Sequence, residues 1–361
     1  MQSWIQQIES GAGWVWGRLS GALLAPLDEA SRFHWADLLV FVLLACVSVY
    51  WYRDRKLSLL EGLSRVFPKR VYAHPSAKVD YQIYFAHALL VPLYTAMRYP
   101  VEAFMISATS GWLMDAFGGR DASAVSAPHY VAFGLLLFLM RDFAAFIWHL
   151  AAHKSPVLWP FHKVHHSAEV MTPLTLYREH PVYNGLNGLV KAVMMGPTLG
   201  LIAYLCVGRM DPLTSLVFVT GFDLFAFLGS HLRHSHHWVS YGPHLSRIFI
   251  SPAQHQIHHS VELRHRDKNF GVTLAIWDWL FRTLYVPAER ESFEFGVGDG
   301  RPQPHPSILR AYTVPFAEVA RVVAGRVEPK PAQEPQRRRS GTRLRPKAPR
   351  RKVPAKRRAR G

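Results

Sequence analysis

Residues 253–259 read AQHQIHH and place His255, His258 and His259 at positions i, i+3 and i+4. On an α-helix these positions lie on one face, so the three imidazoles can converge on one point. The same spacing recurs at residues 162–166, which read HKVHH. Neutral imidazole is a good ligand for iron, zinc and copper, and the two triplets therefore predict a metal site made of helical histidines.

Two further groups of histidines lie close to these triplets in the sequence. Residues 149–153 read HLAAH, an i, i+4 pair, and residues 231–237 read HLRHSHH. Nine histidines stand at spacings compatible with metal binding: His149, His153, His162, His165, His166, His234, His255, His258 and His259. One zinc ion is satisfied by three or four ligands, so nine candidates favour two metal ions.

Residues 231–237 hold more histidines than one site needs. We expect His234 to be the ligand, and His231, one helical turn earlier, is the second choice. For His236 and His237 two roles stay open. They either support the metal ligands from outside or simply lie at the membrane interface.

Two residues outside these groups are weaker candidates for the site. His180 precedes a proline in the sequence REHP, which favours a loop residue over a ligand or a hydrogen-bond donor to one. Asp142 is expected to form an ion pair with its neighbour Arg141. The alternative for Asp142 is a hydrogen bond to a ligating histidine.

Several apolar runs are long enough to cross a bilayer. Residues 35–52 read WADLLVFVLLACVSVYWY and are followed by basic residues, which predicts a span with an aromatic belt and a basic anchor. Further spans are expected at residues 81–97, 130–148, 186–207 and 212–228. Glu102 and Asp115 interrupt the apolar run 101–117, which we interpret as a re-entrant or interfacial helix.

The charges beside the first span predict its orientation. Residues 53–78 contain seven Lys or Arg and two acidic residues, an excess typical of the cytoplasmic side. With this span count, all four histidine groups face the cytoplasm at the ends of spans. An all-imidazole site beside an apolar cavity suits oxygen activation, and hydrolysis is disfavoured because no HExxH motif occurs.

Most of the net charge of +17 belongs to the C-terminal tail. Residues 330–361 contain fourteen Lys or Arg and one Glu, which leaves +4 for the rest of the chain. This composition predicts a disordered tail that contacts anionic lipid headgroups, and nucleic acid is not expected as a partner. Cys46 and Cys206 lie in apolar runs and are expected to be packed thiols.

We therefore expect an all-α, polytopic membrane bundle with a cytoplasmic histidine-rich cap and a disordered basic tail. Its five parts are an N-terminal amphipathic segment with the first span (1–80), the second span with the re-entrant or interfacial segment (81–129), the catalytic domain (130–285), a C-terminal extension (286–328) and the tail (329–361). Residues 311–326 are expected to form an amphipathic helix within the extension.

The histidine motifs resemble those of the fatty acid hydroxylase/sterol desaturase superfamily, the histidine-rich membrane di-iron enzymes. The similarity covers roughly residues 130–285 and is strongest with the bacterial sterol-desaturase-like and alkylglycerol-monooxygenase-like branch. It rests on HLAAH at 149–153, HKVHH at 162–166, LRHSH at 232–236, HQIHH at 255–259 and KNFGVTLAIWD at 268–278. The resemblance implies that the nine histidines hold two iron ions, with His234 as the isolated ligand between the two HxxHH motifs.

The resemblance also implies a reaction and its partners. The expected reaction uses dioxygen and two electrons to hydroxylate or desaturate a lipid, such as a sterol, a fatty acyl chain or an alkyl ether. No flavin, haem or nicotinamide motif is visible, so the electrons are expected from a separate donor, a ferredoxin or cytochrome-type reductase system. The expected location is the inner membrane of a bacterium, with the histidines on the cytoplasmic side.

Two other functions stay open. A membrane metal-binding or transport protein would need polar residues along its spans, whereas these histidines lie at span ends. A non-catalytic member of the family is the other alternative, and the complete histidine motifs count against it.

Overall fold

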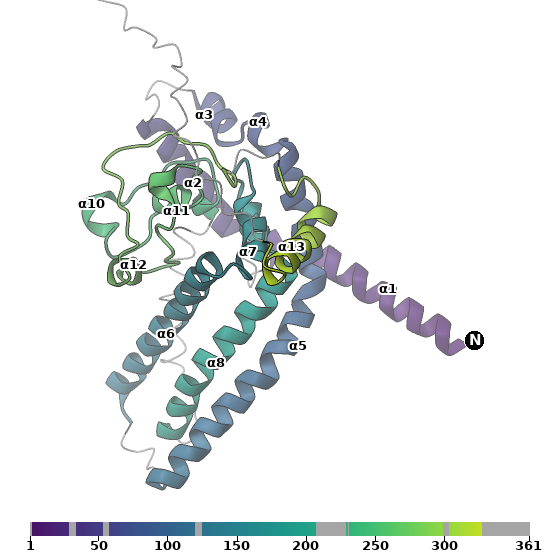
Figure 1. Cartoon of the computed structure of the whole chain (residues 1–361), viewed down its shortest axis with the longest axis vertical. Helices are drawn as coiled ribbons and strands as arrows, with labels where there is room; N and C mark the ends of the chain where they lie inside the picture. The colour runs from purple at the N-terminus through teal and green to yellow at the C-terminus, as the bar shows by residue number, and fades with distance from the viewer. Residues whose placement is uncertain are drawn as a thin grey trace, which may run out of the picture. The chain divides into compact units, whose positions relative to one another are not determined.

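The computed structural model describes residues 2–28, 34–52, 58–119, 125–206, 229, 231–298 and 303–326 (Figure 1). The expected span at 212–228 and the tail at 329–361 lie outside the described residues. Within them, regular structure is helical apart from two isolated β-bridges. This confirms the prediction of an all-α chain.

The α-helices differ widely in length, from one turn to more than ten. They are α1 (Gln2–Leu23), α2 (Trp35–Tyr52), α3 (Leu59–Val66), α4 (Lys69–Tyr72), α5 (Pro75–Phe117), α6 (Ala127–Lys154), α7 (Trp159–His166), α8 (Pro181–Leu205), α10 (Gly242–Leu245), α11 (Pro252–His258), α12 (Ile276–Leu280) and α13 (Ile308–Val323). The helix expected at 311–326 is thus confirmed as α13, displaced by three residues.

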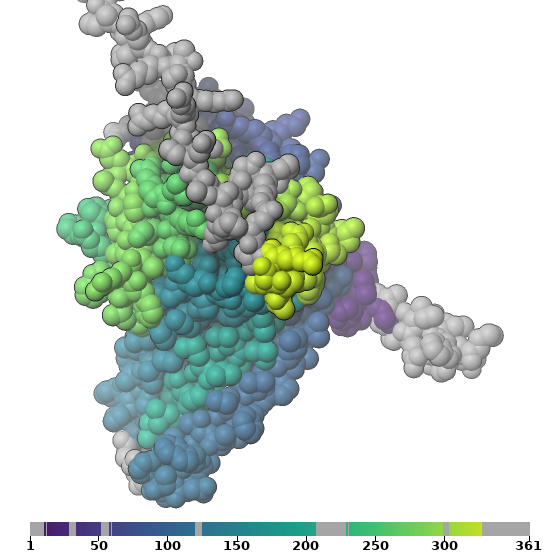
Figure 2. Space-filling view, in the orientation of Figure 1, coloured from purple at the N-terminus to yellow at the C-terminus, as the bar shows by residue number. Residues whose placement is uncertain are grey.

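Helices α5, α6 and α8 lie side by side, and the cap helices α7 and α11 lie at one end of them (Figure 1). By length and composition, α6 and α8 are able to cross a membrane, and α2 is a shorter apolar helix. Figure 2 shows the elements of the cap, in green, above the blue and teal surfaces of these long helices. The long apolar helices therefore begin or end where the cap is built.

Glycines allow α5 and α8 to approach closely. A Cβ atom on Gly196 would lie 2.4 Å from the Cβ of Met105, and one on Gly200 would lie 2.7 Å from the carbonyl oxygen of Ile106. Small residues at such contacts let two backbones pack tightly, which is a common device between membrane helices. The α5–α8 pair is therefore closely packed below the cap.

Helix α5 is continuous, whereas the sequence suggested a span at 81–97 followed by a separate helix at 101–117. Pro92 and Pro100 lie inside α5 without ending it. Glu102, which motivated the separation, pairs with Arg98 one turn earlier at 3.4 Å, so its charge does not interrupt the helix. With 43 residues, α5 is about 65 Å long, roughly twice the hydrocarbon thickness of a bilayer.

A buried ion pair connects α5 to the cap. Asp80 and Arg178 lie 2.8 Å apart, and both side chains are fully buried. Arg178 also donates to the carbonyl oxygens of Val164 in α7 and of Ser76 in α5. Since Val164 stands between two of the candidate histidines, this arginine fixes the metal-site helix against α5.

Candidate metal centre

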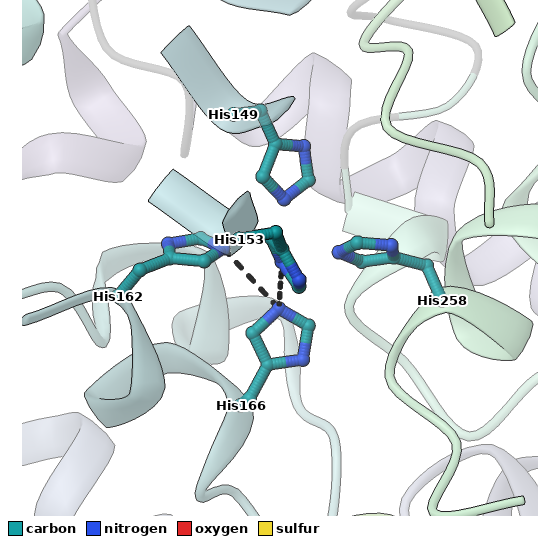
Figure 3. Close-up of side chains that lie close together, drawn as sticks. All are labelled: His149, His153, His162, His166 and His258. Atoms are coloured by element: carbon teal, nitrogen blue, oxygen red, sulfur yellow. Dashed lines mark hydrogen bonds between the residues drawn. The ribbon is translucent and has the colours of Figure 1, made fainter. Parts of the chain in front are cut away.

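The nine histidines that the sequence predicts as ligands lie in two adjacent groups. Group one contains His149, His153, His162, His166 and His258; group two contains His165, His234, His255 and His259. Within each group, the nitrogen atoms available to a metal lie within 4.8 Å of one another. Figure 3 shows the rings of group one pointing toward a common centre from α6, α7 and α11.

Each HxxHH triplet is divided between the two groups. In α7, His162 and His166 point into group one and His165 into group two. In α11 the division is reversed, with His258 in group one and two histidines in group two. Residues i and i+4 are only about 40° apart around a helix, whereas i+3 and i+4 are about 100° apart, so one triplet serves two centres. The expectation that each triplet converges on one point is therefore wrong.

The imidazoles of each group meet through their Nε2 atoms. In group one, the Nε2 of His166 lies 3.2 Å from that of His162 and 3.0 Å from that of His153. In group two, the Nε2 of His234 lies 3.2 Å from that of His165 and 2.9 Å from that of His255. Such a cluster of facing nitrogens is the donor set that a borderline metal ion prefers.

Two further Nε2 atoms support this assignment. Among the described residues, the Nε2 atoms of His149 and His258 are buried and have no hydrogen-bond partner. The Nδ1 of His149 donates to the carbonyl oxygen of Phe270 at 2.8 Å, and that of His258 donates to the carbonyl oxygen of Lys268 at 2.7 Å. A carbonyl oxygen only accepts, so each Nδ1 carries the proton and each Nε2 presents a lone pair to group one. The residues fit a bound metal ion.

The two carbonyls belong to one backbone segment with an unusual conformation. Asp267 and Asn269 have φ values of 57° and 59°, in the left-handed region that costs a non-glycine residue on the order of 1 kcal/mol. Buried Asp278 holds the segment by accepting from the backbone N–H groups of Phe270 and Gly271 at 2.8 and 2.7 Å. Asp278, which stands between two tryptophans in the sequence, was not among the predicted site residues.

Asp142 supports the same segment. Its carboxylate accepts from the backbone N–H groups of Thr273 and Leu274 at 2.9 and 3.0 Å, and from the indole N–H of Trp277 at 2.8 Å. These three bonds account for the burial of the Asp142 carboxylate. They replace the partners that the sequence suggested, which were Arg141 in an ion pair or a ligating histidine. Asp142 thus acts on the metal groups only through the backbone that it fixes.

The remaining histidines of residues 231–237 lie outside both groups. His231 packs edge-on against Phe41, with ring centroids 6.4 Å apart. His236 and His237 direct their Nε2 atoms to the backbone carbonyl oxygens of Arg65 and Val66, at 3.3 and 3.2 Å. They therefore connect the cap to α3, and His234 is the member of this segment that joins a metal group.

His180 also lies outside both groups and caps the N-terminus of α8. Its Nδ1 accepts from the backbone N–H of Val182 at 3.1 Å. Its Nε2 donates to the carbonyl oxygen of Tyr312 at 3.1 Å. Both nitrogens are engaged, so the loop role favoured by the sequence agrees with its position.

Burial keeps these imidazoles neutral. It lowers the pKa of His165 to about 3, with a further contribution from the neighbouring His149. Burial also lowers, to well below the ordinary value, the pKa of His162, His166, His234, His255, His258 and His259. The neutral form is the one that binds a metal ion, so both groups are prepared for binding at neutral pH.

Comparison with known proteins finds similarity in this region of the chain. The family model "Fatty acid hydroxylase" matches residues 134–283. The chain is 30% identical over 171 residues to ornithine lipid hydroxylase OlsE of Rhizobium tropici, which covers 46% of each chain. It is 28% identical over 152 residues to alkylglycerol monooxygenase of Caenorhabditis elegans, covering 42% of this chain and 26% of that one.

Human cholesterol 25-hydroxylase is a further relative. It is 30% identical over 164 residues, which cover 44% of this chain and 54% of the human protein. The matches thus span from about a quarter to about half of these relatives' lengths. No solved structure matches the chain.

The division into two groups predicts the effect of single substitutions on metal content. We expect the iron-loaded chain to hold two ions, and His162→Ala or His234→Ala to lower the content by about one ion per chain. Inductively coupled plasma mass spectrometry of the purified protein measures this number. His244→Ala, which replaces an exposed histidine of the cap, is the matched control and should keep both ions. Equal iron content in all four proteins would contradict the two-group site.

The lowered histidine pKa values predict acid sensitivity of the metal-free chain. An unfolded histidine binds a proton near pH 6.5, whereas these buried rings resist protonation, so the unfolded state takes up more protons as the pH falls. Stability should be fully present above pH 6.5 and fall below it, by up to about 1.4 kcal/mol per pH unit for each such histidine. Thermal unfolding after chelation, at pH 7.5 and 5.5, measures the loss. A pH-independent transition would contradict the assignment of neutral buried imidazoles.

Proposed function

Because residues 134–283 belong to the fatty acid hydroxylase family, we propose that this chain is a membrane di-iron enzyme that uses dioxygen to hydroxylate or desaturate a lipid. The observation that carries the proposal is the pair of adjacent all-histidine groups at the wall of one cavity. Three related proteins, by their names, are a lipid hydroxylase, an ether-lipid monooxygenase and a sterol hydroxylase. They share a lipid substrate, which we extend to this chain.

The proposed reaction balances in either form. In hydroxylation, one C–H bond breaks, one oxygen atom enters the product, and the other leaves as water with two electrons and two protons taken up. In desaturation, the lipid loses two hydrogens and both oxygen atoms leave as two water molecules, with two electrons and two further protons taken up. Two iron ions, one in each histidine group, would supply the oxygen activation that side chains alone lack.

The residues of the chain hold and orient the reacting groups. The carbonyl oxygens of Lys268 and Phe270 fix two histidine rings, so that the donor atoms of group one are aligned before a metal ion binds. Both groups are almost entirely buried, which excludes bulk water from the reaction. Five of the nine histidines also line the cavity, which brings a C–H bond of the substrate close to both groups.

We propose three partners for the site: a membrane, an electron donor and anionic lipid headgroups. α6 and α8 would cross the membrane, and the Lys and Arg excess in residues 53–78 supports a site on the cytoplasmic side, which we propose to be that of a bacterial inner membrane. Electrons would come from a separate ferredoxin or cytochrome-type reductase system, since no motif for an internal electron carrier was found in the sequence. The basic tail would contact anionic lipid headgroups.

A lipid profile tests the proposed function directly. Cells that express the wild-type chain should contain a lipid that gains one oxygen or loses two hydrogens, and His258→Ala should abolish this product. The substitution removes one donor of group one, whereas His244→Ala on the surface serves as the control. Mass spectrometry of total lipids, with protein levels checked, identifies the product and its class.

Identical profiles for wild type and His258→Ala, at equal expression and with reductant and oxygen present, would contradict catalysis. That result would favour a metal-binding role or a non-catalytic member of the family.

A further inference from the structure

An exposed apolar surface lies on the cap, outside the long helices. It consists of five large side chains in and beside the short helices α10 and α12, and we call it the cap patch: Leu245, Ile248, Trp279, Leu280 and Phe281. Their exposed fractions range from 40% to 72%. Large apolar side chains gathered on one surface typically mark a contact with a protein or a membrane.

The two halves of the cap patch are joined by backbone pairing. The carbonyl oxygen of Ile248, just after α10, accepts from the backbone N–H of Ala275, just before α12, at 2.8 Å. Phe249 and Leu274 form an antiparallel β-bridge beside this bond. The apolar side chains of α10 and α12 therefore belong to one continuous part of the cap.

Helix α12 packs against the end of α6 that reaches the cap (Figure 1). The rings of Phe143 and Trp277 lie 4.9 Å apart, and those of Phe146 and Phe281 lie 5.0 Å apart. Both phenylalanines belong to the last two turns of the span expected at residues 130–148. The cap patch is therefore level with the inner end of a span and not above it.

This contact gives the depth of the cap patch in a membrane that α6 crosses. Phe143 precedes the end of the expected span, residue 148, by five residues, which is about 8 Å of helix. Helices that lie in the membrane interface bury their apolar face about 5–10 Å deep. Trp279, which is 72% exposed, is of the residue type enriched at this level. The position and composition of the cap patch both suit the interface.

The charges beside the cap patch suit an anionic membrane surface. Arg247 and Arg282 are exposed, and among the described residues neither has an ion-pair partner. Asp278, the one acidic residue within 242–249 and 276–282, is buried and accepts from backbone N–H groups. Exposed positive charge without exposed negative charge attracts anionic lipid head groups.

The helix that carries half of the cap patch also supports group one. Asp278 of α12 accepts from the backbone N–H of Phe270, whose carbonyl oxygen accepts from His149. His149 follows Phe146 by three residues, about 4.5 Å along α6. With the cap patch in the interface, group one lies at the membrane surface, where a lipid reaches it without leaving the bilayer.

We propose that the cap patch inserts into the bilayer surface as an interfacial anchor, with Trp279 and Leu280 among the upper acyl carbons and Arg247 and Arg282 at anionic lipid head groups. The occupant is lipid because the ring contacts with α6 place the patch level with the span, where a soluble partner does not reach. The inference goes beyond the proposed function and rests on the membrane crossing by α6 proposed there.

Fluorescence quenching in vesicles tests this position. The full-length chain with Cys46→Ala and Cys206→Ala receives one new cysteine that is labelled with an NBD fluorophore. It is then reconstituted into vesicles of equal parts phosphatidylcholine and phosphatidylglycerol. Leu280→Cys reports on α12 and Leu245→Cys on α10. Quenching by phosphatidylcholine with a doxyl group near the top of its acyl chain measures contact with lipid, and quenching by iodide measures contact with water.

Two further labels calibrate the result. Leu135→Cys, at an exposed position within the α6 span, should be quenched by the doxyl lipid. Ser64→Cys, at an exposed polar position of α3, should be quenched by iodide. We expect the doxyl lipid to quench the labels at Leu280 and Leu245 at least about threefold more strongly than the label at Ser64. Variants with wild-type metal content count as folded.

The role of the two arginines is tested with the label at Leu280. Quenching by the doxyl lipid should increase when phosphatidylglycerol is added to vesicles of phosphatidylcholine alone. The double substitution Arg247→Gln, Arg282→Gln should remove this increase. Lys69→Gln, at an exposed position of α4, is the matched control and should keep it.

Iodide quenching at Leu280 and Leu245 as strong as at Ser64, with Leu135 still quenched by the doxyl lipid, would overturn the proposal and favour a surface for a soluble partner. The proposed function would stand, because no turnover is measured. If the label at Leu135 is also quenched by iodide and not by lipid, both the anchor and the membrane location fail.

Discussion

Nine imidazole rings are buried in the cap, seven of them with an Nε2 atom about 3 Å from that of another ring, and the surrounding structure maintains this contact. Buried polar atoms are unfavourable without partners, and the other rings offer only weak compensation. Metal ions between the rings would remove this cost. The Asp80–Arg178 ion pair, the left-handed residues at 267 and 269 and the buried Asp278 all hold backbone that would otherwise relax away from the rings.

The sequence predicted the identity of the clustered histidines because their spacing is a property of single helices. It did not predict that each HxxHH triplet serves two centres, since that depends on how α7 and α11 face each other. The carbonyl oxygens of Lys268 and Phe270 were also invisible, because every residue has a carbonyl and only the backbone conformation aims it. Asp142 was given the wrong partner for a similar reason: its real partners, such as Trp277, are more than 130 residues away.

Hydropathy predicted the positions of α2, α6 and α8. It did not predict the length of α5, because Glu102 was expected to interrupt the apolar run, whereas in the structure it pairs with Arg98 within one continuous helix. Average hydropathy also concealed the polar face of α8. Lys191 and two asparagines are diluted by apolar neighbours in a window of membrane length, yet the fold gathers them on one cavity with Arg141 of α6.

Anomalous diffraction from crystals of the iron-loaded chain, recorded at the iron absorption edge, tests whether each histidine group holds an iron ion. We predict two peaks, one among the five histidines of group one and one among the four histidines of group two. A single peak, or iron bound away from these nine residues, would contradict it.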